Sequence, residues 1–343
     1  MTNGMGPQRD FDVVLALSGG NALGAFEAGA YQALHEHDLF PDWIVGASIG
    51  AINGALIAGS AMADRLGTLR DFWQPESFGL GAPGTPWLPS AMDVARRCTA
   101  AMSTMMLGRA GLFGPLLSSL TPWTDDQPSL FETEQLAATL DRLVDFDLLN
   151  RGECRYTSTA VDLATGDDVV FDSRSGTIDS RHVRASAALP MLFPPLEIDG
   201  RWLIDGGISA NLPLDPILSS PGARPQLCLA VDLLPLGQVL PATVGEAASR
   251  MQDLIFAAQS RRTLERWRMA HAGNDEISLT LVRIAYADQG DEVAGKAMDF
   301  SGPTIERRWA AGYKTMLNVI ERLHDGSLQP VQHGFHVPEL ETT

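Results

Sequence analysis

Two kinds of apolar pattern alternate along the amino-terminal part of the chain. The run 11–17 is short, rich in valine and followed by Ser18-Gly19-Gly20, which is typical of a buried strand entering a tight turn. The run 25–37 is rich in alanine, leucine and glutamate, which favours a helix. A second short strand over 43–45 and a buried helix over 49–62 repeat this order. The alternation predicts a parallel sheet covered by helices.

Strand and helix patterns continue to the end of the chain without an internal repeat or a clear linker. The patterns predict helices over 131–149, 183–189, 243–270 and 305–323, and strands over 156–162, 168–171, 202–204, 227–233 and 277–286. We expect loose termini over 1–10 and 327–343.

The segment 78–128 differs in composition from the rest and predicts an insertion over the sheet. It contains many glycines and prolines, and a predicted helix over 91–107 carries Met92, Met102, Met105 and Met106. Ordinary covering of the core is one interpretation. The other is a flexible apolar lid that meets acyl chains, since methionine adapts to irregular shapes.

Composition and charge narrow the classes of partner. The chain has 343 residues, 45% of them hydrophobic, which suits one large α/β domain with extensions or two small domains. The net charge of −17 argues against a nucleic-acid partner and against electrostatic docking on an anionic bilayer. Any contact with a membrane would therefore use apolar surface.

The cysteines and the absence of targeting patterns favour a cytoplasmic protein, with peripheral contact to membranes left open. Cys98, Cys154 and Cys228 are far apart and odd in number, which indicates a reducing compartment and neither a disulfide framework nor a zinc site. The first ten residues lack a signal pattern, and no apolar run approaches the roughly 18–20 residues of a spanning helix. We expect no metal and no cofactor. The oligomeric state cannot be read from the sequence.

A G-x-S-x-G pattern, Gly46-Ala47-Ser48-Ile49-Gly50, lies between a predicted strand and a predicted helix. In this context the serine sits on a sharp turn with a strained backbone, and Gly46 and Gly50 avoid side-chain collisions within the turn. The helix amino terminus would then favour negative charge developing near the serine. Ser48 is therefore a candidate nucleophile, although the same residues could merely pack a helix close to a sheet.

The glycine-rich loop 18–24 joins the first strand to the first helix and allows three roles. A dinucleotide site would need glycine at position 21, which is Asn21, and an acid after the second strand, whereas Asp42 precedes it. A simple tight turn is the second role. An oxyanion hole built from the amides of Gly19, Gly20 and Asn21 fits better, because a candidate serine nucleophile lies at the end of the neighbouring strand. Asparagine also tolerates a positive φ.

Asp205-Gly206-Gly207 follows a short apolar strand and supplies a candidate base for the serine. Taken alone, Asp-Gly is also common in hairpin turns. A serine hydroxyl needs a group that takes its proton, and none of the seven histidines lies in a catalytic motif. His271 or His324 as the base of a histidine triad is the alternative.

Together these motifs resemble the patatin-like phospholipase family over about residues 11–234. The segment 17–34 resembles its oxyanion segment, Ser48 matches its nucleophile, and Asp205 matches its catalytic acid. Further matching runs are Arg184-Ala185-Ser186-Ala187-Ala188-Leu189-Pro190, Phe193-Pro194-Pro195 and Asn211-Leu212-Pro213. The runs Asp299-Phe300-Ser301 and Glu306-Arg307-Arg308-Trp309-Ala310-Ala311-Gly312-Tyr313 resemble a C-terminal extension found on some bacterial members.

The resemblance implies a three-layer α/β/α fold with a mostly parallel central sheet, plus a C-terminal helical extension. It implies an acyl hydrolase domain over 11–234, with the insertion 78–128, and an extension over 235–330 packed on it. It also implies a Ser48–Asp205 dyad that cleaves lipid carboxylic esters through an acyl-enzyme. The family's loop usually carries a third glycine and a basic residue where this chain has Asn21 and Leu23, which weakens the case for gripping a phosphate and favours broad ester substrates. An acyltransferase with the same dyad and a catalytically silent lipid-binding module are the alternatives.

Overall fold

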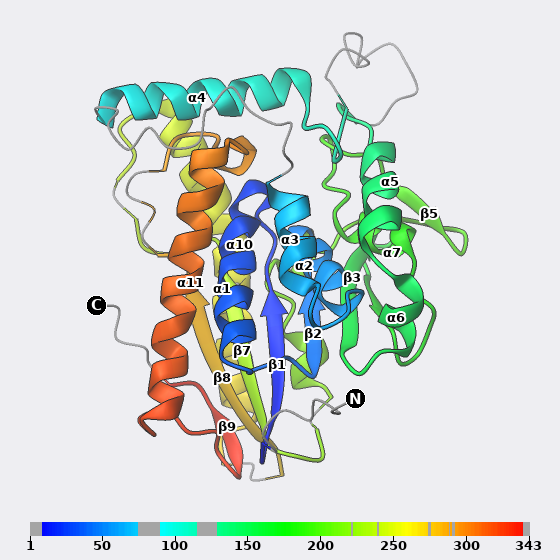
Figure 1. Ribbon diagram of the computed structural model, residues 1–343, viewed down its shortest axis with the longest axis vertical. Helices are drawn as coiled ribbons and strands as arrows, with labels where there is room; N and C mark the ends of the chain where they lie inside the picture. The colour runs from blue at the N-terminus through cyan, green and yellow to red at the C-terminus, as the bar shows by residue number, and fades with distance from the viewer. Residues whose placement is uncertain are drawn as a thin grey trace.

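One mixed sheet organises the molecule (Figure 1). The structure is a computed structural model and describes residues 9–74, 90–114, 129–220, 222–238, 240–273, 276–287, 289 and 292–338. Within these ranges nine strands form a single sheet in the order β5-β6-β3-β2-β1-β7-β8-β9, with β4 also paired to β3. The strands are β1 (Asp12–Leu17), β2 (Trp43–Gly46), β3 (Arg155–Asp162), β4 (Asp168–Asp172), β5 (Leu196–Ile198), β6 (Arg201–Asp205), β7 (Gln226–Asp232), β8 (Ser278–Ala285) and β9 (Gly334–His336).

The run from β3 through β2, β1, β7 and β8 to β9 is parallel, and the antiparallel pairs join β3 to β4, β3 to β6 and β5 to β6. The mostly parallel sheet predicted from the sequence is thus confirmed. The helices are α1 (Ala25–Glu36), α2 (Ile49–Ala58), α3 (Arg65–Trp73), α4 (Ser90–Leu107), α5 (Glu134–Leu143), α6 (Phe146–Arg151), α7 (Ser180–Ser186), α8 (Gly207–Ala210), α9 (Asp215–Leu218), α10 (Val244–Ala270) and α11 (Gly302–His324), with short 3-10 turns η1 (Asn21–Gly24) and η3 (Lys296–Met298).

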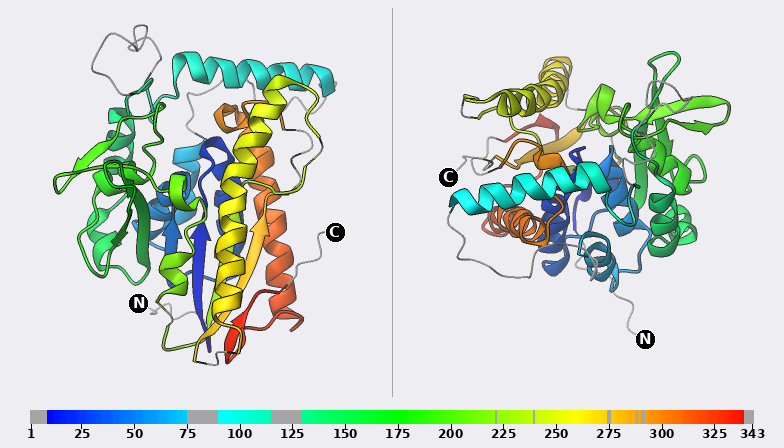
Figure 2. Two further views of the ribbon diagram at one scale, coloured as in Figure 1. Left: turned by 180° about the vertical axis from the view of Figure 1, so that it is seen from behind. Right: turned by 90° about the horizontal axis from the view of Figure 1, so that it is seen from above.

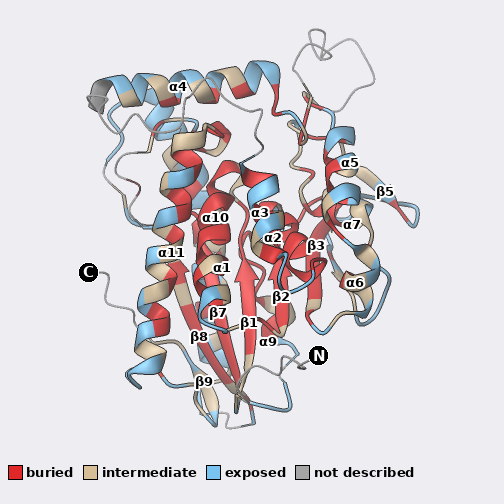
Figure 3. Cartoon of the chain, viewed as in Figure 1, coloured by how far each residue is buried: buried red, intermediate tan, exposed pale blue. Residues whose placement is uncertain are grey.

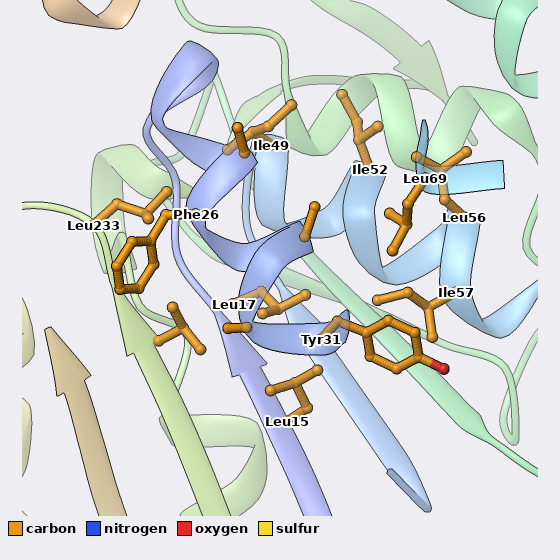
Figure 4. Close-up of a cluster of buried hydrophobic side chains, with 14 of the residues drawn as sticks. Leu15, Leu17, Phe26, Tyr31, Ile49, Ile52, Leu56, Ile57, Leu69 and Leu233 are labelled. Carbon is orange, nitrogen blue, oxygen red and sulfur yellow. The ribbon is translucent and has the colours of Figure 1, made fainter. Parts of the chain in front are cut away.

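Helices cover both faces of the sheet, which confirms the three layers. Figures 1 and 2 show α1 and α11 on one face and α10 on the other. Because side chains alternate along a strand, Leu15 and Leu17 of β1 pack under α1 and α2, whereas Val14 and Ala16 join Leu264 of α10 in a second cluster. The strands are buried and the outer helices keep one exposed side (Figure 3). Figure 4 shows the first cluster, in which Phe26 and Tyr31 of α1 close over the strand.

The C-terminal part of the chain extends the same sheet. The strand β8 pairs along the whole length of β7, and α11 packs closely on α1. The two helices touch through glycines: a Cβ atom on Gly29 would lie 1.9 Å from the Trp309 carbonyl oxygen, and one on Gly312 would lie 1.9 Å from that of Phe26. The strand predicted over 277–286 is β8, so the C-terminal extension is not purely helical.

Three expectations from the sequence need correction or fall outside the described residues. The tail is not loose up to β9, which pairs with β8, and Leu328 is buried. The helix predicted over 131–149 is two helices, because Asp145 caps a new helix by accepting a hydrogen bond from the Leu148 amide at 2.9 Å. The helix predicted over 91–107 is α4. Of the proposed insertion 78–128, residues 78–89 and 115–128 lie outside the described residues, as do 1–8, 75–77 and 339–343.

Candidate active site

The carboxyl ends of two strands face each other along one edge of β3. Gly46, the last residue of β2, pairs with Ser158, and Asp205, the last residue of β6, pairs with Ala160. Because β4 pairs with the same stretch of β3, β2 and β6 share the opposite edge of β3. Parallel β2 and antiparallel β6 therefore point at one another, and this brings the turn that carries Ser48 next to Asp205.

The turn at Ser48 is a tight strand-to-helix elbow. Ser48 has a φ of 56° and a ψ of −125°, in the left-handed half of φ space that a non-glycine residue rarely adopts. A Cβ atom on Gly46 would lie 2.4 Å from the Gly50 carbonyl, and one on Gly50 would lie 2.3 Å from the Leu17 carbonyl oxygen. The two flanking glycines are therefore a steric requirement of this turn.

Asp205 is a buried carboxylic acid whose proton affinity is raised. Only 2% of the surface of this residue is exposed to solvent. Burial raises the pKa of Asp205 to about 6, while hydrogen bonds from the Ser48 side chain and the Gly207 amide oppose this rise. The Gly207 nitrogen lies 2.7 Å from Asp205 Oδ1. A carboxyl group with a pKa near 6 beside a serine hydroxyl can act as a proton acceptor near neutral pH.

The glycine-rich loop lies against the elbow. A Cβ atom on Gly19 would lie 3.0 Å from Ser48 Cβ. The Gly19 amide, which the sequence places in an oxyanion hole, donates instead to the Asn211 carbonyl oxygen at 2.9 Å. In the part of the chain that the structure describes, the amides of Gly20 and Asn21 have no such acceptor, and both residues line a cavity with Ser48. Asn21 has a φ of 52°, as its position in the loop predicts.

Two buried residues that connect the loops did not stand out as site residues in the sequence. The Asn211 side chain donates to the Gly19 carbonyl oxygen at 3.1 Å, which fixes the glycine-rich loop to the segment after Asp205. The Ser186 carbonyl oxygen accepts from the amides of Ser48 at 3.0 Å and of Gly206 at 3.3 Å. Both lie in runs that resemble family motifs, and that was the only signal available from the sequence.

An apolar cavity of about 270 Å³ opens from Ser48 and Asp205. Its walls come from several parts of the chain. The lining residues include Ile49, Ile52, Met105, Leu112, Phe113, Leu136, Leu189, Leu192, Phe193, Leu234, Phe256 and Met298. Phe256 belongs to α10 and Met298 to η3, so the C-terminal extension forms part of the wall. Its mostly hydrocarbon lining can accept an acyl chain.

The alternative bases lie away from this cavity. None of the residues described as lining it is a histidine. His271 follows the far end of α10, where its ring stacks on Trp267 at 4.9 Å between centroids, and His324 ends α11 near His37. Over the same described residues, no group of three or more His, Cys, Asp or Glu side chains is arranged to hold a metal ion.

Comparison with known protein families gives the class to which this chain belongs. A family model described as patatin-like phospholipase matches residues 15–218, and a second described as patatin phospholipase matches residues 244–329. The chain belongs to the patatin-like phospholipase family.

Relatives of this family differ in length from the present chain. An uncharacterized NTE family protein of Mycobacterium tuberculosis is 28% identical over 221 residues, which cover 64% of this chain and 49% of the relative. A lysophospholipase of Aspergillus terreus is 29% identical over 238 residues, 69% of this chain and 13% of the relative. The aligned part of this chain thus spans about half the length of the mycobacterial relative. Among solved structures, VipD from Legionella pneumophila aligns at a TM-score of 0.47 with 16% identity, over 91% of this chain and 67% of VipD.

Proposed function

We propose that the chain hydrolyses carboxylic esters of lipids, with Ser48 as nucleophile and Asp205 as its proton acceptor. The observation that supports this proposal most directly is that the strained Ser48 and the buried Asp205 line the same apolar cavity, with the Ser48 side chain close enough to lower the pKa of Asp205. A hydrolase needs these three features together, since the nucleophile must be activated, its base must be tuned, and the substrate must be held.

The proposed reaction has two halves. The Ser48 oxygen attacks the ester carbonyl carbon while Asp205 takes the hydroxyl proton, and the tetrahedral oxyanion accepts hydrogen bonds from the amides of Gly20 and Asn21. As the carbonyl re-forms, the alcohol leaves with the proton held by Asp205, and an acyl-enzyme remains on Ser48. Water then attacks the acyl carbon, Asp205 takes its proton, and the acid departs as that proton returns to Ser48.

The loop amides are suited to this task by geometry. Oxyanion donors contribute roughly 3 kcal/mol each in hydrolases. The Gly19 amide is occupied by Asn211, so the free donors come from the next two residues of the loop. In the first turn of α2, by contrast, the Gly50 amide donates to the Ala47 carbonyl oxygen at 2.9 Å and the Ala51 amide to that of Ser48 at 3.0 Å. Negative charge on the substrate oxygen would therefore face the backbone N–H groups of Gly20 and Asn21.

The cavity favours an acyl chain over a charged head group. No lysine or arginine is among the residues described as lining it. Leu23, which stands where the family's loop usually carries a basic residue, is fully buried. These features support broad lipid ester substrates, including lysophospholipids and neutral glycerides, whose polar part stays outside. The lysophospholipase names of the fungal relatives support the same class.

The decisive experiment compares wild type with Ser48→Ala on a short-chain nitrophenyl ester. We expect the variant to lose about a thousandfold or more in kcat with an unchanged circular dichroism spectrum. The exposed Ser209→Ala, on α8 beside the site, is the matched control and should keep full activity. A folded Ser48→Ala that retains a tenth of wild-type turnover would contradict the assignment.

Two alternatives use the same residues differently. For an acyltransferase, product analysis with added alcohol acceptors would show acyl transfer in preference to release of free acid. For a catalytically silent lipid-binding protein, a fluorophosphonate probe would leave Ser48 unlabelled. Labelling of wild type, but not of Ser48→Ala, together with release of free acid would support the hydrolase.

A further inference from the structure

Helix α4 presents an exposed, uncharged stripe at the carboxyl end of the sheet. It lies across that end as an outer element of the molecule (Figures 1 and 2). Arg97, Ala101 and Thr104 face inward, whereas Met102, Met105 and Met106 are 68%, 46% and 55% exposed. No charged residue occurs between positions 98 and 107. The spacing of three and four residues places the three methionines side by side on one face of the helix.

The arginines of α4 do not contribute charge to this stripe. Arg96 donates to Asp93 at 2.8 Å and to Ser301 at 2.8 Å, and Arg97 pairs with Asp93 at 3.0 Å. These ion pairs occupy the side of the helix that faces the C-terminal extension. Of the residues that the structure describes on α4, the two arginines are thus held by Asp93 and Ser301 and are not available to bind lipid phosphates beside the stripe.

Helix α10 carries a second exposed apolar stripe. Met251, Leu254 and Ile255 are exposed, again at a spacing of three and four residues. The only charged residue between positions 251 and 260 is Asp253, which is buried and pairs with Lys296 at 2.7 Å. This stripe is therefore also free of exposed charge.

Both stripes border the mouth of the candidate active site. Met105 of the first stripe lines the cavity while remaining exposed, and Phe256, directly after Ile255 of the second stripe, lines it as well. Exposed Ile208 adjoins Gly207, which is another lining residue. We call the exposed side chains of Met102, Met105, Met106, Met251, Leu254 and Ile255 the apolar rim. Exposed apolar side chains gathered at the mouth of a cavity mark an interaction site.

We infer that the apolar rim docks the protein on an uncharged lipid surface, such as phosphatidylcholine, and places the cavity mouth against its acyl chains. This inference rests on the proposed function. The rim consists of two amphipathic helix faces, as in proteins that lie in a membrane interface. It lacks the tyrosine, tryptophan and arginine anchors typical of protein interfaces. A rim without exposed cations on a chain of net charge −17 gains nothing from anionic lipid.

The test measures co-flotation of the full chain with phosphatidylcholine vesicles at low and high salt. The variant Met102→Gln/Met106→Gln keeps helix propensity and changes neither lining residues nor proposed catalytic residues. The matched control Met62→Gln/Met269→Gln replaces two exposed methionines, one after the end of α2 and one in the last turn of α10, neither of which lines the cavity. Hydrolysis of a short-chain soluble ester is measured in parallel.

We expect wild type and control to bind phosphatidylcholine equally at both salt concentrations, and the rim variant to bind about tenfold more weakly or less. Adding phosphatidylglycerol should weaken binding. A rim variant that binds like wild type, or binding that requires anionic lipid and falls with salt, would overturn the inference. It would also be overturned by a wild-type dimer in light scattering that the rim variant dissociates, because a second copy would then cover the rim.

The two proposals can fail separately. Vesicle binding that depends on the rim in a protein without soluble-ester activity would leave the rim as a lipid-docking surface and refute the hydrolase. Full soluble-ester activity without any vesicle binding would refute the lipid-docking role of the rim, and the proposed hydrolase function would stand.

Discussion

Replacing Asp205 with asparagine is expected to stabilise the folded protein while removing its activity. Burial raises the pKa of this carboxyl from an ordinary 3.8 to about 6. A tenfold change in proton affinity corresponds to about 1.4 kcal/mol, so the ionised carboxylate lowers the free energy of unfolding by roughly 3 kcal/mol at pH 8. Asparagine has the same shape, stays neutral and can still accept the hydrogen bond from the Gly207 amide.

The pH dependence of the free energy of unfolding determines whether the substitution stabilises or destabilises the protein. Between pH 3.8 and 6 the folded state holds a proton on Asp205 that the unfolded state has released, so wild-type stability falls as pH rises through this window. The Asp205→Asn variant lacks this loss. The free energy of unfolding of the variant should exceed that of wild type only slightly near pH 4. The difference should reach about half of its full value at pH 5 and its full value of roughly 3 kcal/mol by pH 8.

Urea unfolding of both proteins at pH 5 and pH 8 measures this difference directly. Contributions from other titrating groups cancel, because they are common to both proteins. Asp199→Asn, in the exposed turn between β5 and β6, is the control and should show no comparable pH-dependent gain. An Asp205→Asn variant that is less stable than wild type at pH 8, or whose advantage is equal at both pH values, would refute the electrostatic reasoning.

Further predictions follow from the same geometry. The kcat/KM for a short-chain ester should fall as pH drops through an apparent pKa of about 6, because Asp205 must be ionised to accept a proton; a flat profile from pH 5 to 8 would contradict this. Gly312→Ala should lower the free energy of unfolding by about 2 kcal/mol or more, since its Cβ would lie 1.9 Å from the Phe26 carbonyl oxygen; in chemical denaturation the control Gly67→Ala, on the open side of α3, should be neutral or stabilising. Asn211→Ala should lower kcat about ten- to hundredfold with a smaller change in KM, because the glycine-rich loop loses a hydrogen bond that positions it; steady-state kinetics with kcat unchanged would remove Asn211 from the site.

Much of the fold follows from short-range patterns in the sequence. The strands β1, β2 and β7 and the helices α1, α2 and α10 occur close to where the periodicity of apolar residues predicts them. The elbow at Ser48 could also be foreseen, because two glycines flank it and no larger residue fits there. Such features depend on a few neighbouring residues, and their steric limits can be read directly from the residue types.

Expectations failed where distant contacts outweigh local preference. The tail after residue 326 contains few strong strand formers, yet β9 pairs with β8 because the edge of the sheet offers it backbone partners. The break between α5 and α6 also involves a distant segment, because the Asp145 amide donates to the Gly59 carbonyl oxygen at 2.9 Å. The use of the Gly19 amide by Asn211 joins residues 192 positions apart, which no local pattern encodes.

Each motif with candidate chemistry can thus be identified from neighbouring residues in the sequence. The motifs are a serine on a glycine-flanked turn, an aspartate before two glycines, and a loop rich in backbone donors. Their meeting in one site depends on long-range strand pairing. Strands β2 and β6 share one edge of β3 with opposite directions, and this arrangement alone sets Ser48 against Asp205. Burial of that carboxylate, which raises its pKa, likewise arises from packing of segments that are remote in sequence.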